Sequence, residues 1–164
     1  MSRQPAPAGS DLSRAAAIFL VVFAVYFVTY SRALPPTSDE MINYSLAQSI
    51  AKWQIFSIDQ VSTVGPTPNQ IGLGEHRYSK FGPLQAILTA PLFWLARALP
   101  IGSVDTVLLL NYILSALSVA ILFLLARRLG YRPEVALIVA GLTAFGTPLW
   151  VHAKRFYGEP TITL

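Results

Sequence analysis

Two neighbouring acids, Asp39 and Glu40, are the residues whose types and spacing most directly allow chemistry in this chain of 164 residues. They lie at the start of an expected surface helix, because apolar residues recur with helical spacing at positions 42, 46 and 50. A carboxylate held there could accept a proton from a hydroxyl group, or bind an ammonium group or a divalent cation. A structural interpretation stays equally open, since Thr37 and Glu40 fit a capping box and first-turn acids favour the helix dipole. If Glu40 serves the cap, Asp39 is the acid free to face a cavity.

A basic and aromatic cluster follows a loop rich in Gly and Pro. It contains Arg77, Tyr78 and Lys80. These side chains could clamp a phosphodiester at a membrane surface, because lysine and arginine bind phosphate oxygens through charged hydrogen bonds. The residue types alone favour a simpler role as an interfacial anchor at the depth of the lipid headgroups.

A second polar cluster lies near the end of the chain and contains His152, Lys154, Arg155 and Glu159. It follows an expected helix break at residues 146–148, and it would face the same compartment as the first cluster. The two clusters could converge on one cavity, although His152 alone is typical of an interfacial histidine. The sequence contains no H-x-x-H, H-E-x-x-H, G-x-S-x-G or P-loop motif, so no metal site is predicted from spacing.

The elements that must position these residues belong to a membrane protein. Only 12% of the residues are charged, 54% are hydrophobic, and the mean hydropathy is +0.53. These values exclude an ordinary soluble domain, whose charged fraction is about 25%, and a disordered tail. The net charge of +4 comes from scattered basic residues, so no nucleic-acid partner is expected. Cysteine is absent, which excludes disulfides and thiol chemistry.

The predicted fold class is all-α, with polytopic transmembrane helices and an external loop that carries amphipathic juxtamembrane helices. Apolar runs predict spans over residues 15–34, 104–126 and 134–151. Residues 1–14 would form a cytoplasmic tail and 127–133 a cytoplasmic turn. Residues 35–103 would form the external loop, with helices over 38–54 and 81–97, and 152–164 a second external segment. The first run also resembles a cleaved signal peptide, with Arg3 and Arg14 as its basic region.

Basic residues set the expected orientation. If Arg14 is cytoplasmic, two crossings return Arg127, Arg128 and Arg132 to the cytoplasm, whereas a third crossing by 81–97 would place them outside. The positive-inside rule therefore predicts that 81–97 lies in the interface or in a cavity. Since the chain stops within a new apolar helix, we expect a fragment of a larger multi-span protein located in a bacterial inner membrane, with its N-terminus in the cytoplasm.

The order of these motifs resembles the N-terminal part of the GT-C glycosyltransferases, in particular the protein O-mannosyltransferase and lipid A aminoarabinose transferase group. The resemblance rests on the external Asp-Glu pair, the element Tyr-Ser-Lys-Phe-Gly-Pro-Leu at 78–84, Gly-Thr-Pro-Leu-Trp at 146–150 and Phe-Tyr-Gly-Glu-Pro at 156–160. It implies transfer of a sugar, with inversion, from a polyprenyl-phosphate donor to a lipid, glycan or protein acceptor. Asp39 matches the acid that activates the acceptor, with Glu40 beside it. Lys80 matches the donor-phosphate contact, although Phe-Gly displaces the family's first proline.

The resemblance implies no required cofactor, and a divalent cation at Asp39 and Glu40 stays an open possibility. Two other classes of protein also stay open. A transporter component would carry ionisable residues within its spans, and the central parts of the three predicted spans contain none. A non-catalytic membrane subunit would use Asp39 and Glu40 only as a helix cap.

Overall fold

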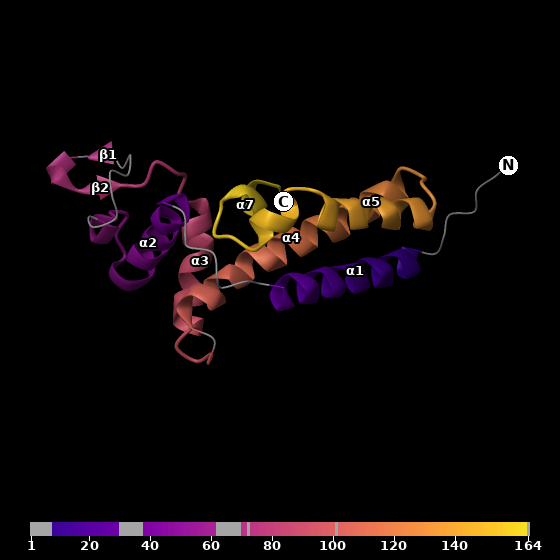
Figure 1. The fold of residues 1–164 in the computed structure, drawn as a ribbon, viewed down its shortest axis with the longest axis horizontal. Coiled ribbons are helices and arrows are strands. Elements are labelled where there is room, and N and C mark those ends of the chain that lie inside the picture. The colour runs from indigo at the N-terminus through magenta and orange to yellow at the C-terminus, as the bar shows by residue number, and fades with distance from the viewer. Residues whose placement is uncertain (1–7, 30–37, 62–69, 72, 101, 164) are drawn as a thin grey trace.

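The computed structural model of the chain describes residues 8–29, 38–61, 70–71, 73–100 and 102–163, and most of them are helical. Its two longest helices are α1 (Ala8–Val28) and α4 (Ser103–Arg128). Both are long and apolar enough to cross a membrane. At 1.5 Å per residue they measure roughly 30 and 40 Å, against about 30 Å for a hydrocarbon core. They lie side by side along the long axis of the molecule (Figure 1).

The first helix begins earlier than expected. Half of the predicted cytoplasmic tail, from Ala8 onward, belongs to α1. Asp11 in its first turn accepts hydrogen bonds from Arg127 Nε at 3.0 and 3.1 Å, one to each carboxylate oxygen. Because Arg127 lies in the last turn of α4, the two helices are antiparallel, and the start of α1 and the end of α4 share one end of the molecule.

The predicted span over 134–151 is interrupted. Helix α5 (Pro133–Gly146) has 14 residues and packs against α4, and the short helix α6 (Leu149–Ala153) follows it. Pro148 explains the break, because a proline disfavours the helical conformation of the residue before it. Thr147 is extended, with φ −122° and ψ 169°. A third short helix, α7 (Glu159–Thr163), returns the chain to the side of α4.

The two predicted juxtamembrane helices are present as α2 (Ser38–Trp53) and α3 (Leu84–Leu95). Helix α3 has 12 residues, so its length of about 18 Å is too short to cross a hydrocarbon core of about 30 Å. It runs across the end of α4, with α2 packed against it (Figure 1). That the segment 81–97 does not span the membrane stays a prediction.

A small strand pair was not predicted. Strand β1 (Gln70–Ile71) pairs with β2 (Arg77–Tyr78) in antiparallel register. The short 3-10 helix η1 (Asp59–Val61) precedes β1, and η2 (Leu73–Glu75) connects the two strands. The amide of Ile58 donates to the carbonyl of Arg77 at 2.8 Å and ties this pair to the end of α2. Strands of two residues carry too little alternation to be seen in a sequence.

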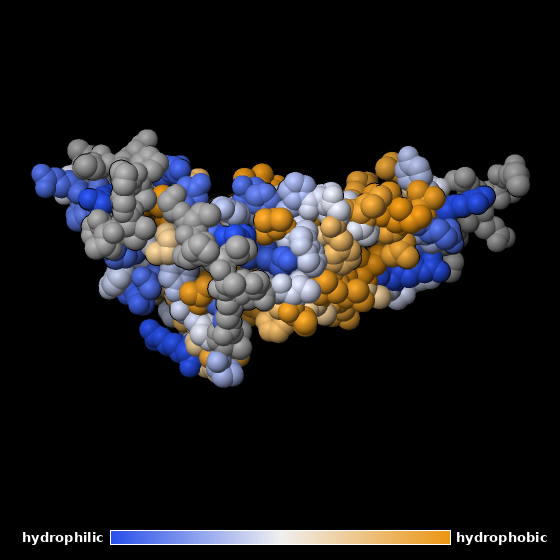
Figure 2. All heavy atoms as spheres, in the orientation of Figure 1, coloured by the Kyte–Doolittle hydropathy of each residue, from blue (hydrophilic) through white to orange (hydrophobic). Residues whose placement is uncertain are grey.

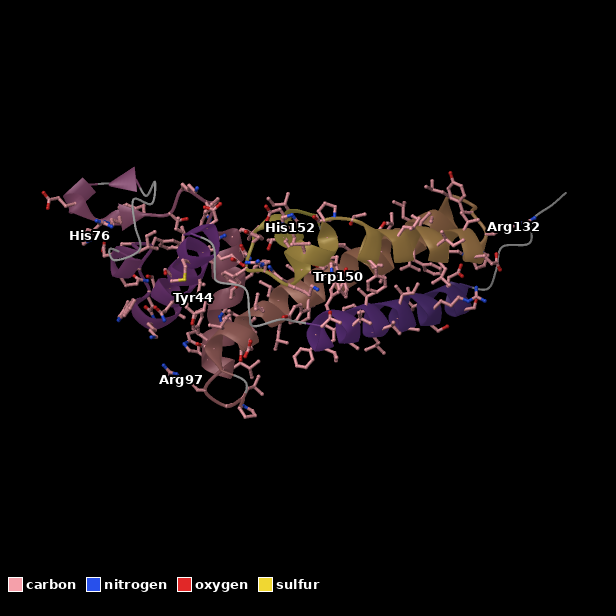
Figure 3. All side chains as sticks on the ribbon, viewed as in Figure 1. Tyr44, His76, Arg97, Arg132, Trp150 and His152 are labelled. Atoms are coloured by element: carbon pink, nitrogen blue, oxygen red, sulfur yellow. The ribbon has the colours of Figure 1, made fainter. Side chains whose placement is uncertain are left out.

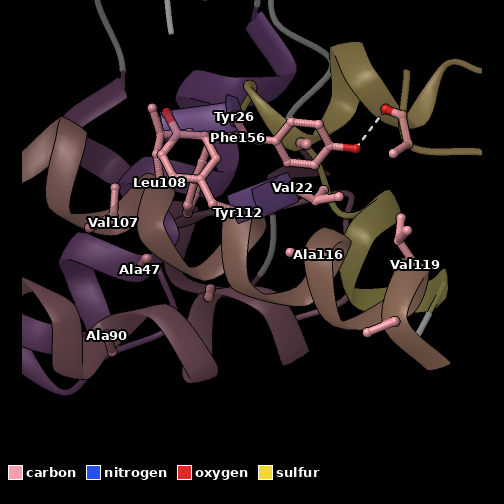
Figure 4. Close-up of a cluster of buried hydrophobic side chains, with 14 of the residues drawn as sticks. Val22, Tyr26, Ala47, Ala90, Val107, Leu108, Tyr112, Ala116, Val119 and Phe156 are labelled. Carbon is pink, nitrogen blue, oxygen red and sulfur yellow. Dashed lines mark hydrogen bonds between the residues drawn. The ribbon is translucent and has the colours of Figure 1, made fainter. Parts of the chain in front are cut away.

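The core follows α4: α1 and α5 pack along it, and α2 and α3 extend the core at the start of α4 (Figure 4). Tyr26 of α1 is fully buried, and its hydroxyl donates to the carbonyl of Ala144 at 2.7 Å. Small residues at four-residue spacing on α5, namely Ala136, Ala140 and Ala144, are buried and allow close approach to α4.

The outer faces of these helices are apolar and exposed. Leu20 of α1 is 62% exposed and Leu142 of α5 is 63% exposed. Figure 2 shows the hydrophobic residues as a band over the middle of the helical part, with hydrophilic residues at both ends. A band of this kind is unfavourable in water and is typical of a surface covered by lipid or by partner protein.

Candidate functional site

Asp39 and Lys80 form an ion pair at the end of the molecule opposite the Asp11–Arg127 pair. Lys80 Nζ lies 3.0 Å from Asp39 Oδ1, and the two side chains are 33% and 40% exposed. Helix α2 positions Asp39 in its first turn, and the turn between β2 and α3 positions Lys80. Within that turn the hydroxyl of Ser79 accepts a hydrogen bond from the amide of Phe81 at 3.0 Å, which directs the chain into α3.

A pocket of about 290 Å³ opens beside this ion pair. Its walls come from the start of α2, the start of α3 and the segment around α7, and they include Asp39, Asn43, Gln85, Tyr157 and Glu159. The remaining wall is largely apolar, with Phe81, Leu84 and Ile162. A pocket that combines apolar walls with a few carboxylate and amide groups suits a small polar ligand attached to a hydrophobic chain.

Glu40 has a different role from its neighbour. It is 7% exposed, and its carboxylate accepts hydrogen bonds from Arg155 Nη1 at 3.1 Å and from the amide of Phe156 at 3.2 Å. These contacts join α2 to a segment 115 residues further along the chain. Thr37, the other member of the predicted capping box, lies outside the described residues. Glu40 therefore holds the segment of Arg155 and Phe156 against the start of α2. Of the two neighbouring acids, Asp39 is the one that lines the pocket.

Two buried amides that the sequence reasoning missed hold the other wall of the pocket. Asn111 of α4 is fully buried, and its Nδ2 donates to the carbonyls of Arg155 and Tyr157, the latter at 3.0 Å. Gln85 of α3 donates to the carbonyl of Tyr157 at 2.6 Å and to Asn111 Oδ1 at 3.3 Å. These bonds satisfy carbonyls that the helix break leaves open. Asn111 is a polar residue inside the charge-free run 107–126, and this feature of the sequence could have been used to predict the site.

The remaining members of the second cluster are spread around the break. Lys154 Nζ lies 3.6 Å from the ring centroid of Trp150, and burial lowers the pKa of this lysine. His152 Nδ1 lies 3.7 Å from Glu159 Oε2, and Figure 3 shows His152 close to Trp150 on this part of the chain. Glu159 lines the pocket, whereas His152, Lys154 and Arg155 do not.

Arg77 and Tyr78 do not join Lys80 at the pocket. Their backbone belongs to β2, and the amide of Arg77 donates to Asp59 Oδ1 at 2.7 Å. His76 Nδ1 lies 2.9 Å from the other oxygen of Asp59, at the far end of the molecule from His152 (Figure 3). The amide of Arg77, and then His76, lower the pKa of Asp59. Of the phosphate cluster expected from the sequence, Lys80 contacts the pocket wall through its ion pair with Asp39, but it is not itself a lining residue.

The geometry does not fit a divalent cation shared by Asp39 and Glu40. Successive residues of a helix point about 100° apart, and both oxygens of Glu40 are already bound to Arg155 and Phe156. Among the described residues no group of three His, Cys, Asp or Glu side chains could hold a metal ion.

Comparisons of the chain with family models, with curated proteins and with solved structures find no match.

Proposed function

We propose that this chain forms the donor-binding and base-bearing part of a membrane glycosyltransferase of GT-C type, in a bacterial inner membrane and with its N-terminus in the cytoplasm. The enzyme transfers a sugar with inversion from a polyprenyl-phosphate donor to a lipid, glycan or protein acceptor on the external face. The order of motifs described above supports the class of enzyme. The pocket beside Asp39 and Lys80 supports the assignment of the site.

The depth of the pocket favours a lipid-linked substrate. The charge-free run of α4 covers residues 107–126, and Asn111, which holds the pocket wall, lies one turn inside its outer end. A sugar phosphate on a polyprenyl chain brings its charged group to this boundary and leaves its tail in the hydrocarbon. The apolar residues Leu84 and Ile162 line the pocket and offer a surface to the first isoprene units.

The ion pair gives each partner a role in the reaction. An exposed pair of this kind contributes about 0–1 kcal/mol, so a phosphate group competes for Lys80 at little cost. Donor binding then separates Lys80 from Asp39 and leaves the carboxylate free to accept the proton of the acceptor hydroxyl. The hydroxyl oxygen attacks the anomeric carbon, the bond from that carbon to the phosphate oxygen breaks, and Lys80 stabilises the phosphate anion that leaves.

The pairing of Asp39 with Lys80 at the mouth of the pocket is the observation that carries this proposal. Its test is binding of a polyprenyl phosphate to the purified chain in detergent. Lys80→Gln should weaken binding about 10-fold, the loss expected for a charged hydrogen bond. Arg128→Gln, at the opposite end, should leave binding unchanged. Equal affinity of the Lys80 variant and the unsubstituted chain would count against the donor site.

A non-catalytic membrane subunit is the second candidate. The contacts of Glu40 with Arg155 and Phe156 favour it, because they show that one acid of the pair serves structure. In that case the Asp39–Lys80 pair is a second structural contact of the same helix turn, made with the turn between β2 and α3. Substitution of Asp39 would then change stability but no transfer activity in the membrane that contains the protein.

A further inference from the structure

A second pocket, of about 200 Å³, lies where the ends of α2 and α3 meet the start of α4. It shares no residue with the pocket at Asp39. Its walls carry two cations, Lys52 from the last turn of α2 and Arg97 just after α3, together with Trp94 and Ser103. In the part of the chain that the structure describes, no ion pair to a carboxylate is found for either cation.

The position of this pocket along α4 places it at headgroup depth. Ser103 precedes the charge-free run 107–126 by four residues, or about 6 Å of helix. The headgroup layer on each side of a bilayer is about 5–8 Å thick. A pocket at the start of α4 is therefore level with the phosphates of the surrounding lipid when α4 spans the bilayer.

Helix α3 offers a surface for acyl chains next to the two cations. Its exposed face is apolar and includes Ile87, Leu88 and Leu95, each 44% exposed. Trp94 lies between this face and the pocket, and the residue is 57% exposed. Its Nε1 donates a hydrogen bond to the carbonyl of Ala51 at 3.3 Å, which fixes the indole ring against α2. Helix α3 also lies across the long axis, the orientation of a helix in the interface plane (Figure 1).

We infer that this pocket binds the phosphate headgroup of an anionic phospholipid, with Lys52 and Arg97 on the phosphate and the exposed face of α3 against the acyl chains. Charge complementarity selects this occupant, because two cations beside an apolar helix face match an anionic group that carries a hydrophobic tail. A zwitterionic lipid brings its own cation and gains less from the same two side chains.

Native mass spectrometry of the detergent-purified chain tests the inference, after incubation with equal amounts of phosphatidylglycerol and phosphatidylcholine. The chain should retain phosphatidylglycerol in preference, and the double variant Lys52→Gln, Arg97→Gln should lose roughly 25-fold of this preference, at about 5-fold per cation. The matched control Lys52→Arg, Arg97→Lys keeps both charges and should keep the preference. Circular dichroism verifies that all three chains have the same helix content.

Three results would overturn the inference. The first is equal retention of phosphatidylglycerol by the double glutamine variant. The second is full displacement of the lipid by millimolar inorganic phosphate, which would make the pocket a site for a free anion. The third is a dimer in place of a lipid adduct, which would mean that a second copy of the chain covers α3.

Discussion

Replacing Glu40 by glutamine removes the charge from a buried ion pair and keeps the shape of the side chain. Glu40 and Arg155 side chains are 8% and 18% exposed, so the guanidinium of Arg155 would lose its charged partner at a site with little access to water. Breaking a buried pair from one side costs about 3–5 kcal/mol. Glutamine keeps an oxygen for the amide of Phe156, which places the expected loss near the lower end, at about 3 kcal/mol. In a chain of this size that equals roughly 6–12 °C in the midpoint of thermal unfolding.

The neighbouring residue supplies a matched control on the same helix turn. Asp39→Asn breaks the exposed pair with Lys80 and should cost about 0.5 kcal/mol, or roughly 1–2 °C. Both variants are measured by circular dichroism at 222 nm during heating in one detergent. The double variant Glu40→Gln, Arg155→Gln should recover part of the loss, because neither charge is then buried alone. Equal midpoints for Glu40→Gln and Asp39→Asn would refute the view that Glu40 is the structural acid.

Three further predictions concern topology, pH and the helix break. Because the chain has no cysteine, single substitutions Leu129→Cys and Thr163→Cys in sealed vesicles should react with an impermeant maleimide from opposite sides. Reaction from one side only would contradict the return of the chain through α5 and α6 to the other end of α4, where α7 packs. The hydrogen bond from the Arg77 amide holds the pKa of Asp59 below its usual value. The ionised carboxylate therefore stabilises the strand pair above about pH 4. This stabilisation is lost as the pH falls through the lowered pKa. The protection of the Arg77 amide, which is its exchange rate relative to that of an unstructured peptide at the same pH, should fall in that acid range. Asp59→Asn should remove this fall in protection, and an unchanged protection profile in the variant would exclude Asp59 as its source. Asn111→Leu removes the donor to the carbonyl of Arg155, whereas the carbonyl of Tyr157 keeps Gln85, and the variant should lose about 1–3 kcal/mol in thermal unfolding. A loss below about 1 kcal/mol would mean that another group satisfies the carbonyl of Arg155.

The helices were predictable because their signals are local. Apolar periodicity gave α2 close to its observed bounds, and apolar runs gave α3 and α4. The start of α1 was placed too late, because hydropathy marks the part of a helix that suits lipid and not the polar turns before it. Pro148 indicated the break after α5, but no sequence rule gives the fold of the chain beyond such a break.

The candidate site was predictable only in part, because its contacts join residues far apart in the chain. The sequence singled out Asp39 and Lys80, and the structure brings them within 3.0 Å of one another. It also offered two roles for Glu40, a cap or an acid of the site, and neither included the contact with Arg155. Gln85 and Asn111 escaped notice because amides carry no charge and match no catalytic motif, although each lies in an apolar helix where a polar group needs a partner.

Transfer of a labelled sugar tests the proposed function most directly. The measurement uses membranes that contain the protein, a polyprenyl-phosphate sugar donor and an external acceptor. Asp39→Asn should reduce turnover at saturating donor at least 100-fold, the usual contribution of a general base. Lys80→Gln should raise the KM for the donor and, because Lys80 also stabilises the leaving phosphate, should lower turnover as well. Undiminished turnover by Asp39→Asn, with the same dependence on donor as the unsubstituted protein, would contradict the assignment of the site.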